Sequence, residues 1–290
     1  MTGNLSTAVL GRTEIPVTRL GYGTAMKQAL SDDAWGRILN QVLDNGINFI
    51  DTANVYGPAE EQIGRHISRR RSEYYLATKW GWPPWDSEWT GENLVQGVRD
   101  CLQRLQTDYV DVMMLHNPPE KDLDGGDVVS ALADVKAEGK ARWIGVSTVL
   151  PELQTFVEWN VFDVVQVAYS ALERQQEAWL PIMDRAGNGI VVRGGVAQGE
   201  PGEGRGSAER WDVYDRARLD ELRPDAETRT SFMLRYTLSN PHVHTTIVGT
   251  SNLDHLEANL AAAERGPLPE EVRKAVDERL AAVSESDGAK

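Results

Sequence analysis

An aspartate, a tyrosine, a lysine and a histidine stand where their side chains could act together on one oxygen atom. Asp51 ends an apolar run at 47–50 and opens "DTANVYG", which places Tyr56 five residues later, while Lys79 and His116 end the later runs "YYLATK" and "VDVMMLH". A phenol beside an ammonium group gives up its proton more readily, because the positive charge stabilises the phenolate. We expect Asp51 to hold Lys79 charged. Tyr56 and His116 would then donate to an oxygen on which negative charge develops, so the site would protonate a carbonyl oxygen.

These residues must be positioned by the predicted strands and helices. Short apolar runs, which predict strands, alternate with amphipathic stretches, which predict helices. The amphipathic stretches lie at 31–44, 59–69, 90–105, 126–138, 151–159, 175–186, 226–239 and 252–264, and a further segment at 267–285 predicts an added C-terminal helix. The strand candidates are "TRLGYG", "GINFID", "YYLATK", "VDVMMLH", "ARWIGVS", "DVVQVAY", "GIVVR" and "HTTIVG". Eight strand-helix units in a chain of this length favour a closed (β/α)8 TIM barrel over an open sheet. We expect residues 1–290 to form a single domain, with 198–225 as its long irregular segment.

Active sites of such barrels collect at the carboxyl ends of the strands. The predicted strand ends carry a row of polar and glycine residues. A purely structural barrel would not need this row, because burying unpaired charges costs free energy. The row consists of Gly21, Gly23, Asp51, Lys79, His116, Ser147, Gln166, Arg193 and Gly249.

Composition excludes several classes of protein. The 290 residues carry a formal net charge of −14, which argues against nucleic acid or an anionic membrane surface as a partner. The single cysteine, Cys101, cannot form an internal disulfide, and no run resembles a signal peptide or a membrane span. We expect a cytoplasmic protein that acts on a small molecule. The sequence leaves its oligomeric state open.

The quoted residues resemble the aldo-keto reductase superfamily from about residue 5 to about residue 264. The resemblance implies a (β/α)8 barrel that binds a nicotinamide cofactor and reduces an aldehyde, ketone or sugar-like carbonyl to the alcohol, or catalyses the reverse reaction. Its catalytic tetrad falls on Asp51, Tyr56, Lys79 and His116. The motifs that carry it are "LGYGTA", "GINFIDTANVYGPAEEQIGRHI", "LATKWG", "VDVMMLHNPP", "ARWIGVST", "DVVQVAYSALERQ" and "TIVGTSNLDHLEANL".

The same resemblance implies a set of cofactor-binding residues, with two departures from the family pattern. Thr148 stands where an Asn usually helps to hold the nicotinamide carboxamide. Arg193 stands where an aromatic ring usually stacks on the nicotinamide. We expect Arg193 to contact the cofactor, by stacking or by pairing with a phosphate. The implied set is Gly23, Thr24, Asp51, Ser147, Thr148, Gln166, Arg193, Gly194, Gly195, Gly199, Gly249, Thr250, Ser251, Asn252, His255 and Asn259.

The segment "TIVGTSNLDHLEANL" implies a preference for NADP(H), with NAD(H) as the alternative. Hydroxyls and backbone N–H groups at a helix start can hold a 2′-phosphate, and His255 adds charge when it is protonated. Asp254 opposes this attraction. We therefore predict a smaller preference than an arginine would give.

Two further regions complete the predicted site. We expect the substrate pocket to be lined by Tyr22, Trp80, Trp82, Trp85 and Asn117. Glycines at 199, 202, 204 and 206 would let the segment after the seventh barrel strand close over the cofactor, although a surface loop without ligand contacts explains them equally well.

Other interpretations stay open at this stage. Lys79 could form a Schiff base, as in an aldolase-type barrel enzyme. The chain could also bind NADPH without catalysis, as a redox-sensing subunit. Taken singly, Asp51 could cap a helix, and His116 could be a structural histidine. A metal site is not expected, because His116 has no second histidine or cysteine at ligand spacing.

Overall fold

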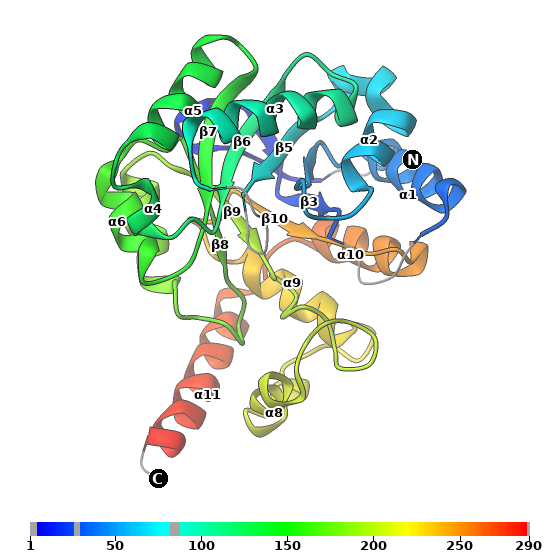
Figure 1. Cartoon of the computed structure of the whole chain (residues 1–290). Helices are drawn as coiled ribbons and strands as arrows, with labels where there is room; N and C mark the ends of the chain where they lie inside the picture. Colours follow the sequence, from blue (N-terminus) through cyan, green and yellow to red (C-terminus); the bar gives the residue numbers. More distant parts are fainter. Residues whose placement is uncertain (1–4, 26–29, 82–87, 289–290) are drawn as a thin grey trace.

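Eight parallel strands form a closed barrel in the computed structural model, which describes residues 5–25, 30–81 and 88–288 (Figure 1). Around the barrel the strands follow the order β10-β3-β4-β5-β6-β7-β8-β9, and each of the eight predicted strand segments overlaps one of them. The bounds are β3 Leu20–Gly23, β4 Phe49–Asp51, β5 Tyr75–Trp80, β6 Val110–His116, β7 Ala141–Ser147, β8 Val164–Ala168, β9 Gly189–Arg193 and β10 Thr245–Val248. The predicted (β/α)8 barrel is confirmed.

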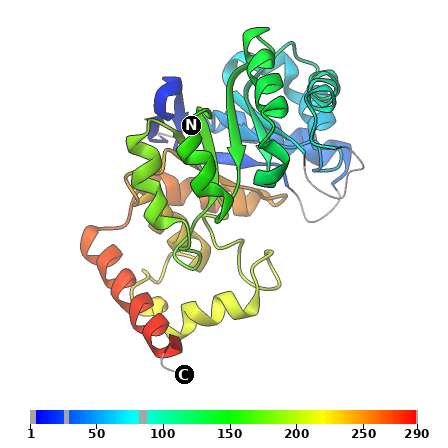
Figure 2. The same cartoon turned by 60° about the vertical axis from the view of Figure 1, so that its left-hand side comes forward.

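Helices lie between the strands and cover the barrel (Figure 2). Several begin at a side-chain N-cap. The side chains of Ser31, Thr90 and Asn252 accept hydrogen bonds from backbone N–H groups of the first turn, which would otherwise stay unpaired. The helices that follow barrel strands are α1 Asp32–Asp44, α2 Ala59–Ile67, α3 Gly91–Leu105, α4 Glu120–Leu123, α5 Asp127–Ala137, α6 Glu152–Trp159, α7 Leu180–Arg185, α9 Arg229–Leu238 and α10 Leu253–Arg265.

The barrel interior follows the period of two that strands impose on their side chains. One apolar cluster contains Phe49, Ala77, Met114, Val164 and Val191, which come from five different strands. Two residues further along the same strands stand Asp51, Lys79, His116, Gln166 and Arg193. The apolar layer therefore supports a polar layer at the carboxyl ends of the strands.

A short hairpin closes the opposite end of the barrel, and the sequence analysis did not predict it. Strands β1 Thr7–Val9 and β2 Pro16–Thr18 pair antiparallel. Leu10, Ile15 and Val17 join the interior apolar cluster. A Cβ on Gly11 would lie 2.3 Å from the backbone nitrogen of Gly189, the first residue of β9. The hairpin thus shields the amino ends of the strands from water.

The segment 198–225, predicted to be irregular, contains the helix α8 Ala208–Arg216, capped by Ser207, and a short turn of helix at Leu219–Glu221. The added C-terminal helix is confirmed as α11 Glu270–Gly288, and it packs against α8. In both views these two helices project together from one side of the barrel (Figures 1 and 2). Within the residues that the structure describes, no helix is both long and apolar enough to cross a membrane.

Candidate active site

Lys79 lies at the centre of a buried polar network in the barrel mouth. Its Nζ donates to Asp51 Oδ2 at 2.6 Å and to the carbonyl oxygen of Thr52 at 2.9 Å, and it lies 3.5 Å from Tyr56 Oη. The side chain of Lys79 is fully buried and that of Asp51 is 2% exposed. Burial alone would lower the pKa of Lys79, but the Asp51 carboxylate and Tyr56 outweigh it and hold that pKa above its ordinary value. Lys79 is therefore an ammonium ion.

The turn after β4 brings Tyr56 back over Lys79. The backbone N–H of Tyr56 donates to the carbonyl oxygen of Ala53 at 3.1 Å, and Gly57 continues the turn with a φ of 58°, which favours glycine. The ring of Tyr56 is half-buried and meets the ring of His116 edge-on, with 5.8 Å between centroids. The four residues predicted as a tetrad are thus neighbours in space.

His116 is neutral at physiological pH. Burial, followed by the positive charges of Lys79 and Arg193, lowers the pKa of His116 to about 2. A neutral imidazole can donate one hydrogen bond to a substrate oxygen, but it cannot serve as the acid that protonates it. The hydroxyl of Tyr56 is then the group in this cluster that could donate a proton.

Asp51 also anchors Gln166 and, through it, Ser147, which are two of the predicted cofactor-binding residues. Gln166 Nε2 donates to Asp51 Oδ1 at 2.8 Å, and Ser147 Oγ donates to Gln166 Oε1 at 2.9 Å. Both oxygens of Asp51 are therefore engaged. Thr148 does not join this chain, because its hydroxyl donates to the carbonyl oxygen of Val149 at 3.3 Å.

A pocket of about 740 Å³ opens above this network. It runs from Asp51, Tyr56 and Gln166 to residues at the start of α10, and it includes most of the predicted cofactor contacts. Among the described residues it is lined by Gly23, Ala25, Asp51, Tyr56, Gln166, Glu173, Arg193, Gly194, Val196, Gln198, Gly199, Glu200, Glu203, Gly204, Arg205, Thr228, Thr230, Ile247, Val248, Gly249, Thr250, Ser251, Asn252, His255, Ala258 and Asn259.

Four of the predicted cofactor contacts lie behind this lining. Thr24, Ser147, Thr148 and Gly195 are buried. Thr24 Oγ1 donates to the carbonyl oxygen of Asp51 at 3.1 Å. Gly195 packs so closely that a Cβ would lie 2.3 Å from Thr246 Oγ1. These four residues therefore lie below the pocket surface and support the residues that line it.

The segment after β9 forms one wall of the pocket. Arg205 Nη2 donates to the carbonyl oxygen of Ala25 at 2.7 Å, which joins this segment to the loop after β3. Trp211 Nε1 in α8 donates to the carbonyl oxygen of Gly199 at 2.8 Å. Several polar residues of this wall and its surroundings also line the pocket and were not predicted from the sequence. They are Glu173, Gln198, Glu200, Glu203, Arg205, Thr228 and Thr230.

The predicted substrate pocket needs correction at two residues. Gly21 and Gly23 occupy the inward positions of β3, so Tyr22 points outward, is 1% exposed and donates to the carbonyl oxygen of Thr250 at 2.7 Å. Lys79 likewise takes the inward position of β5. Trp80 therefore packs against α3, where a Cβ on Gly97 would lie 2.2 Å from its ring. Neither residue lines the pocket.

The remaining predicted substrate residues stay unassigned. Asn117 follows β6 with a φ of 49°, and its N–H donates to the carbonyl oxygen of Ser147 at 2.8 Å, but it does not belong to the described pocket lining. Trp82 and Trp85 lie outside the described residues.

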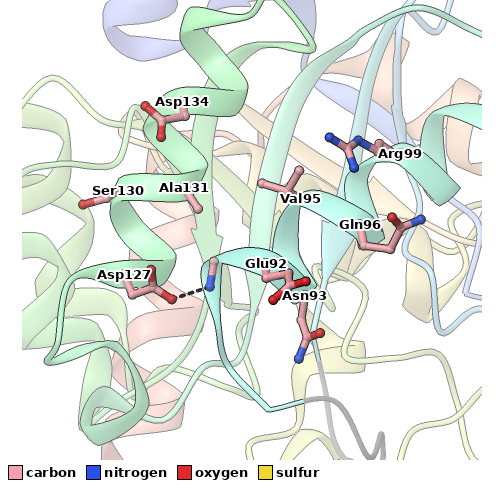
Figure 3. A pocket seen from close by; sticks show the side chains of 10 residues that line it. Glu92, Asn93, Val95, Gln96, Arg99, Asp127, Ser130, Ala131 and Asp134 are labelled. Atoms are coloured by element: carbon pink, nitrogen blue, oxygen red, sulfur yellow. Dashed lines mark hydrogen bonds between the residues drawn. The ribbon is translucent and has the colours of Figure 1, made fainter.

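A second cavity, of about 510 Å³, is a surface groove between α3 and α5 (Figure 3). Asp127 Oδ2 accepts the backbone N–H of Gly91 at 2.5 Å there, so it caps the start of α3. The mixed charges of Glu92, Arg99, Asp127 and Asp134 do not converge on one point (Figure 3). Across the described part of the chain, no group of three or more His, Cys, Asp or Glu residues is placed to hold a metal ion.

Comparison with known proteins identifies the family. Residues 19–281 match the family model described as Aldo/keto reductase family, so the chain belongs to that family and is an oxidoreductase. It is 30% identical to the uncharacterized oxidoreductase YqkF of Bacillus subtilis, a match that covers 94% of each chain.

Two solved structures support the same assignment. The holo form of the aldo-keto reductase AKR11C1 from Bacillus halodurans is 30% identical, with a TM-score of 0.85 over 95% of this chain and 96% of that one. An aldo-keto reductase from Klebsiella pneumoniae in complex with NADPH is 26% identical, with a TM-score of 0.76 over 94% of each chain.

Proposed function

We propose that this protein is an NADP(H)-dependent reductase of aldehydes, ketones or sugar-like carbonyls, with Tyr56 as its proton donor. The observation that carries the proposal is the contact of Lys79 with both Asp51 and Tyr56 at the floor of an elongated pocket. An ammonium ion beside a phenol stabilises the phenolate that proton donation leaves behind.

Each polar residue has a distinct role in this reaction. A bound dinucleotide would supply the hydride to the carbonyl carbon. Tyr56 Oη donates a proton to the carbonyl oxygen, while neutral His116 donates a hydrogen bond that orients the same oxygen. Asp51 keeps Lys79 charged and in place. Burial of this network excludes water, which strengthens each of these electrostatic interactions.

The lining of the pocket fits a dinucleotide. Thr250, Ser251 and Asn252 lead into α10, where the helix dipole and nearby hydroxyls favour a phosphate group. His255 stands in the first turn of α10 and lines the pocket, whereas the negative charge of Asp254 in the same turn opposes phosphate binding. The NADPH complex of the Klebsiella pneumoniae relative supports the preference for NADP(H).

The activity is tested by mixing the purified protein with NADPH and a panel of aldehydes, ketones and sugars. We expect the absorbance of the reduced nicotinamide to fall with some members of the panel, and Tyr56→Phe to abolish most of that loss. Substrate-dependent loss that survives in Tyr56→Phe would contradict the proposed role of Tyr56.

The cofactor preference is tested by the dissociation constants of NADPH and NADH. We expect NADPH to bind more tightly than NADH, and we expect His255→Ala to reduce this difference. Equal or tighter binding of NADH would overturn the NADP(H) preference.

The aldolase alternative is disfavoured by the charge of Lys79. An amine must lose its proton to attack a carbonyl, whereas Lys79 is held protonated by Asp51. Treatment with substrate and borohydride should therefore leave Lys79 unmodified. The cytoplasmic location expected from the sequence stays a prediction.

A further inference from the structure

Arg193 lies at the reaction end of the pocket. It ends β9, two residues after Val191 of the interior apolar cluster, so its side chain begins on the inward side of the barrel. In the order of the barrel, β9 stands opposite β5, which carries Lys79. Arg193 lines the pocket together with Tyr56 and Gln166.

The positive charge of Arg193 has no protein counterion among the described residues, where no carboxylate oxygen lies within 4.0 Å of its guanidinium nitrogens. Asp51 is occupied by Lys79 at 2.6 Å. Glu173, which lines the same pocket, pairs with Arg210 at 3.2 Å. The charges of Asp51 and Lys79 cancel and His116 is neutral, so one positive charge remains at this end of the pocket.

The charge of Arg193 also acts on a residue of the predicted tetrad. Arg193 is one of the causes that lower the pKa of His116, after burial and Lys79. Arg193 is only half-buried, and it donates no side-chain hydrogen bond to any described residue. Its guanidinium is therefore available to a ligand and does not serve to hold the fold together.

The nicotinamide ring must lie at this same end if the proposed function is correct. Hydride transfer requires the reacting atoms to approach to about 3–3.5 Å, so the ring has to lie beside the carbonyl that Tyr56 protonates. The ring would supply two electrons and a proton to the carbonyl carbon as hydride, and Tyr56 would supply the proton to the carbonyl oxygen. The ring is neutral before this step and carries one positive charge after it.

We propose that Arg193 determines specificity for the redox state of the cofactor, because its charge repels the oxidised nicotinamide but not the reduced one. The inference rests on the proposed function and adds the direction in which the reaction is favoured, which is reduction of the carbonyl. Arg193 cannot change the overall equilibrium of the reaction. It shifts binding toward the reduced dinucleotide and promotes release of the oxidised one, which suits an enzyme that works as a reductase.

The test compares dissociation constants of NADPH and NADP⁺, measured by calorimetry without substrate, for the wild type, Arg193→Gln and Arg193→Lys. We expect the wild type to bind NADPH more tightly. Arg193→Gln should lower the ratio of the NADP⁺ constant to the NADPH constant by about tenfold, as expected for unit charges about 10 Å apart at an effective dielectric constant of about 20. Arg193→Lys keeps the charge and should keep most of the ratio.

A matched control is Arg99→Gln, which removes one positive charge from the groove between α3 and α5 and should leave the ratio unchanged (Figure 3). If Arg193→Gln leaves the ratio unchanged, the inference is wrong, and an equal weakening of both forms would instead assign Arg193 to a phosphate group. If the wild type binds neither dinucleotide, the proposed function fails and the inference fails with it.

Discussion

At the scale of single residues, the site depends on where each strand places its last inward side chain. Asp51, Lys79 and His116 each stand two residues beyond an apolar side chain of the barrel interior. The strand period therefore brings a carboxylate, an ammonium ion and an imidazole into one layer, and the turn after β4 adds the phenol of Tyr56. Burial and the neighbouring charges in that layer then determine which of these side chains are ionised.

Replacing Tyr56 with Phe removes the proposed proton donor but keeps the ring that meets His116 edge-on. We expect turnover to fall by about 10² or more, a loss typical of a missing general acid, with NADPH affinity nearly unchanged. Steady-state kinetics and binding titrations measure the two quantities. Near-normal turnover would reject Tyr56 as the proton donor.

Replacing Lys79 with Met leaves the buried carboxylate of Asp51 without its cation. We expect the free energy of unfolding to drop by about 3–5 kcal/mol and the activity to be lost. Adding Asp51→Asn should restore part of the stability, because the unpaired charge is gone, but none of the activity. Urea denaturation of the single and double variants measures this. A double variant no more stable than Lys79→Met would contradict the assigned ion pair.

The lowered pKa of His116 links stability to pH. Between its ordinary pKa of 6.5 and the folded value of about 2, the unfolded chain binds a proton that the folded chain does not. Stability from this residue is therefore complete above pH 6.5 and is lost as the pH falls, at up to about 1.4 kcal/mol per pH unit. His116→Gln should flatten the fall of unfolding free energy between pH 7 and pH 5.

His244 is the internal control for that measurement. Burial also lowers the pKa of His244, so it adds a slope of the same sign that His116→Gln leaves in place. Identical slopes in the wild type and the variant would show that His116 does not titrate as described.

At the scale of elements, the segment after β9 and helix α8 act as one unit over the pocket. Arg205 joins this segment to the loop after β3, and Trp211 fixes Gly199 to α8. Glycine permits this path: Gly199 has a φ of 80°, and a Cβ there would lie 3.0 Å from the Cα of Gly204. A bound dinucleotide would lie beneath this wall.

Arg205→Ala should loosen that wall. A hydrogen bond from a charged donor contributes about 1.5–3 kcal/mol, so its loss should raise the dissociation rate of NADPH by about tenfold or more. Stopped-flow displacement of bound NADPH measures the rate. Arg218→Ala, which removes a mostly exposed arginine from the same stretch of chain, should leave it unchanged. Equal rates for wild type and Arg205→Ala would show that this contact does not retain the cofactor.

The elements that the sequence predicted well are those with a strong period. The eight barrel strands read as continuous apolar runs, and α1 and α3 carry clear amphipathic patterns. The hairpin β1–β2 was missed because each strand has only three residues, and α8 because its charged sequence is weakly amphipathic. Trp80 was misplaced for a different reason. Its aromatic side chain suggested a ligand pocket, but side chains alternate along a strand, so the residue after the inward-facing Lys79 points outward.

At the scale of the whole molecule, α11 links the barrel to the pocket wall. Asp277 accepts a hydrogen bond from Tyr236 Oη of α9 at 2.6 Å and pairs with Arg174 at 3.3 Å. The same helix packs against α8. Its apolar side is buried, with Val276 0% and Leu280 4% exposed. The C-terminal helix therefore supports the element that anchors Gly199.

Leu280→Ala tests whether barrel and C-terminal helix unfold together, as the prediction of one domain requires. Removing a buried leucine should lower the free energy of unfolding by about 2–5 kcal/mol. Tryptophan fluorescence and far-ultraviolet circular dichroism should still follow one coincident transition at lower denaturant concentration. Lys274→Ala on the exposed side of α11 is the control and should change little, since its side chain is 76% exposed. Two separate transitions, or a main transition that Leu280→Ala does not move, would show that α11 folds independently and cannot stabilise the wall of the pocket.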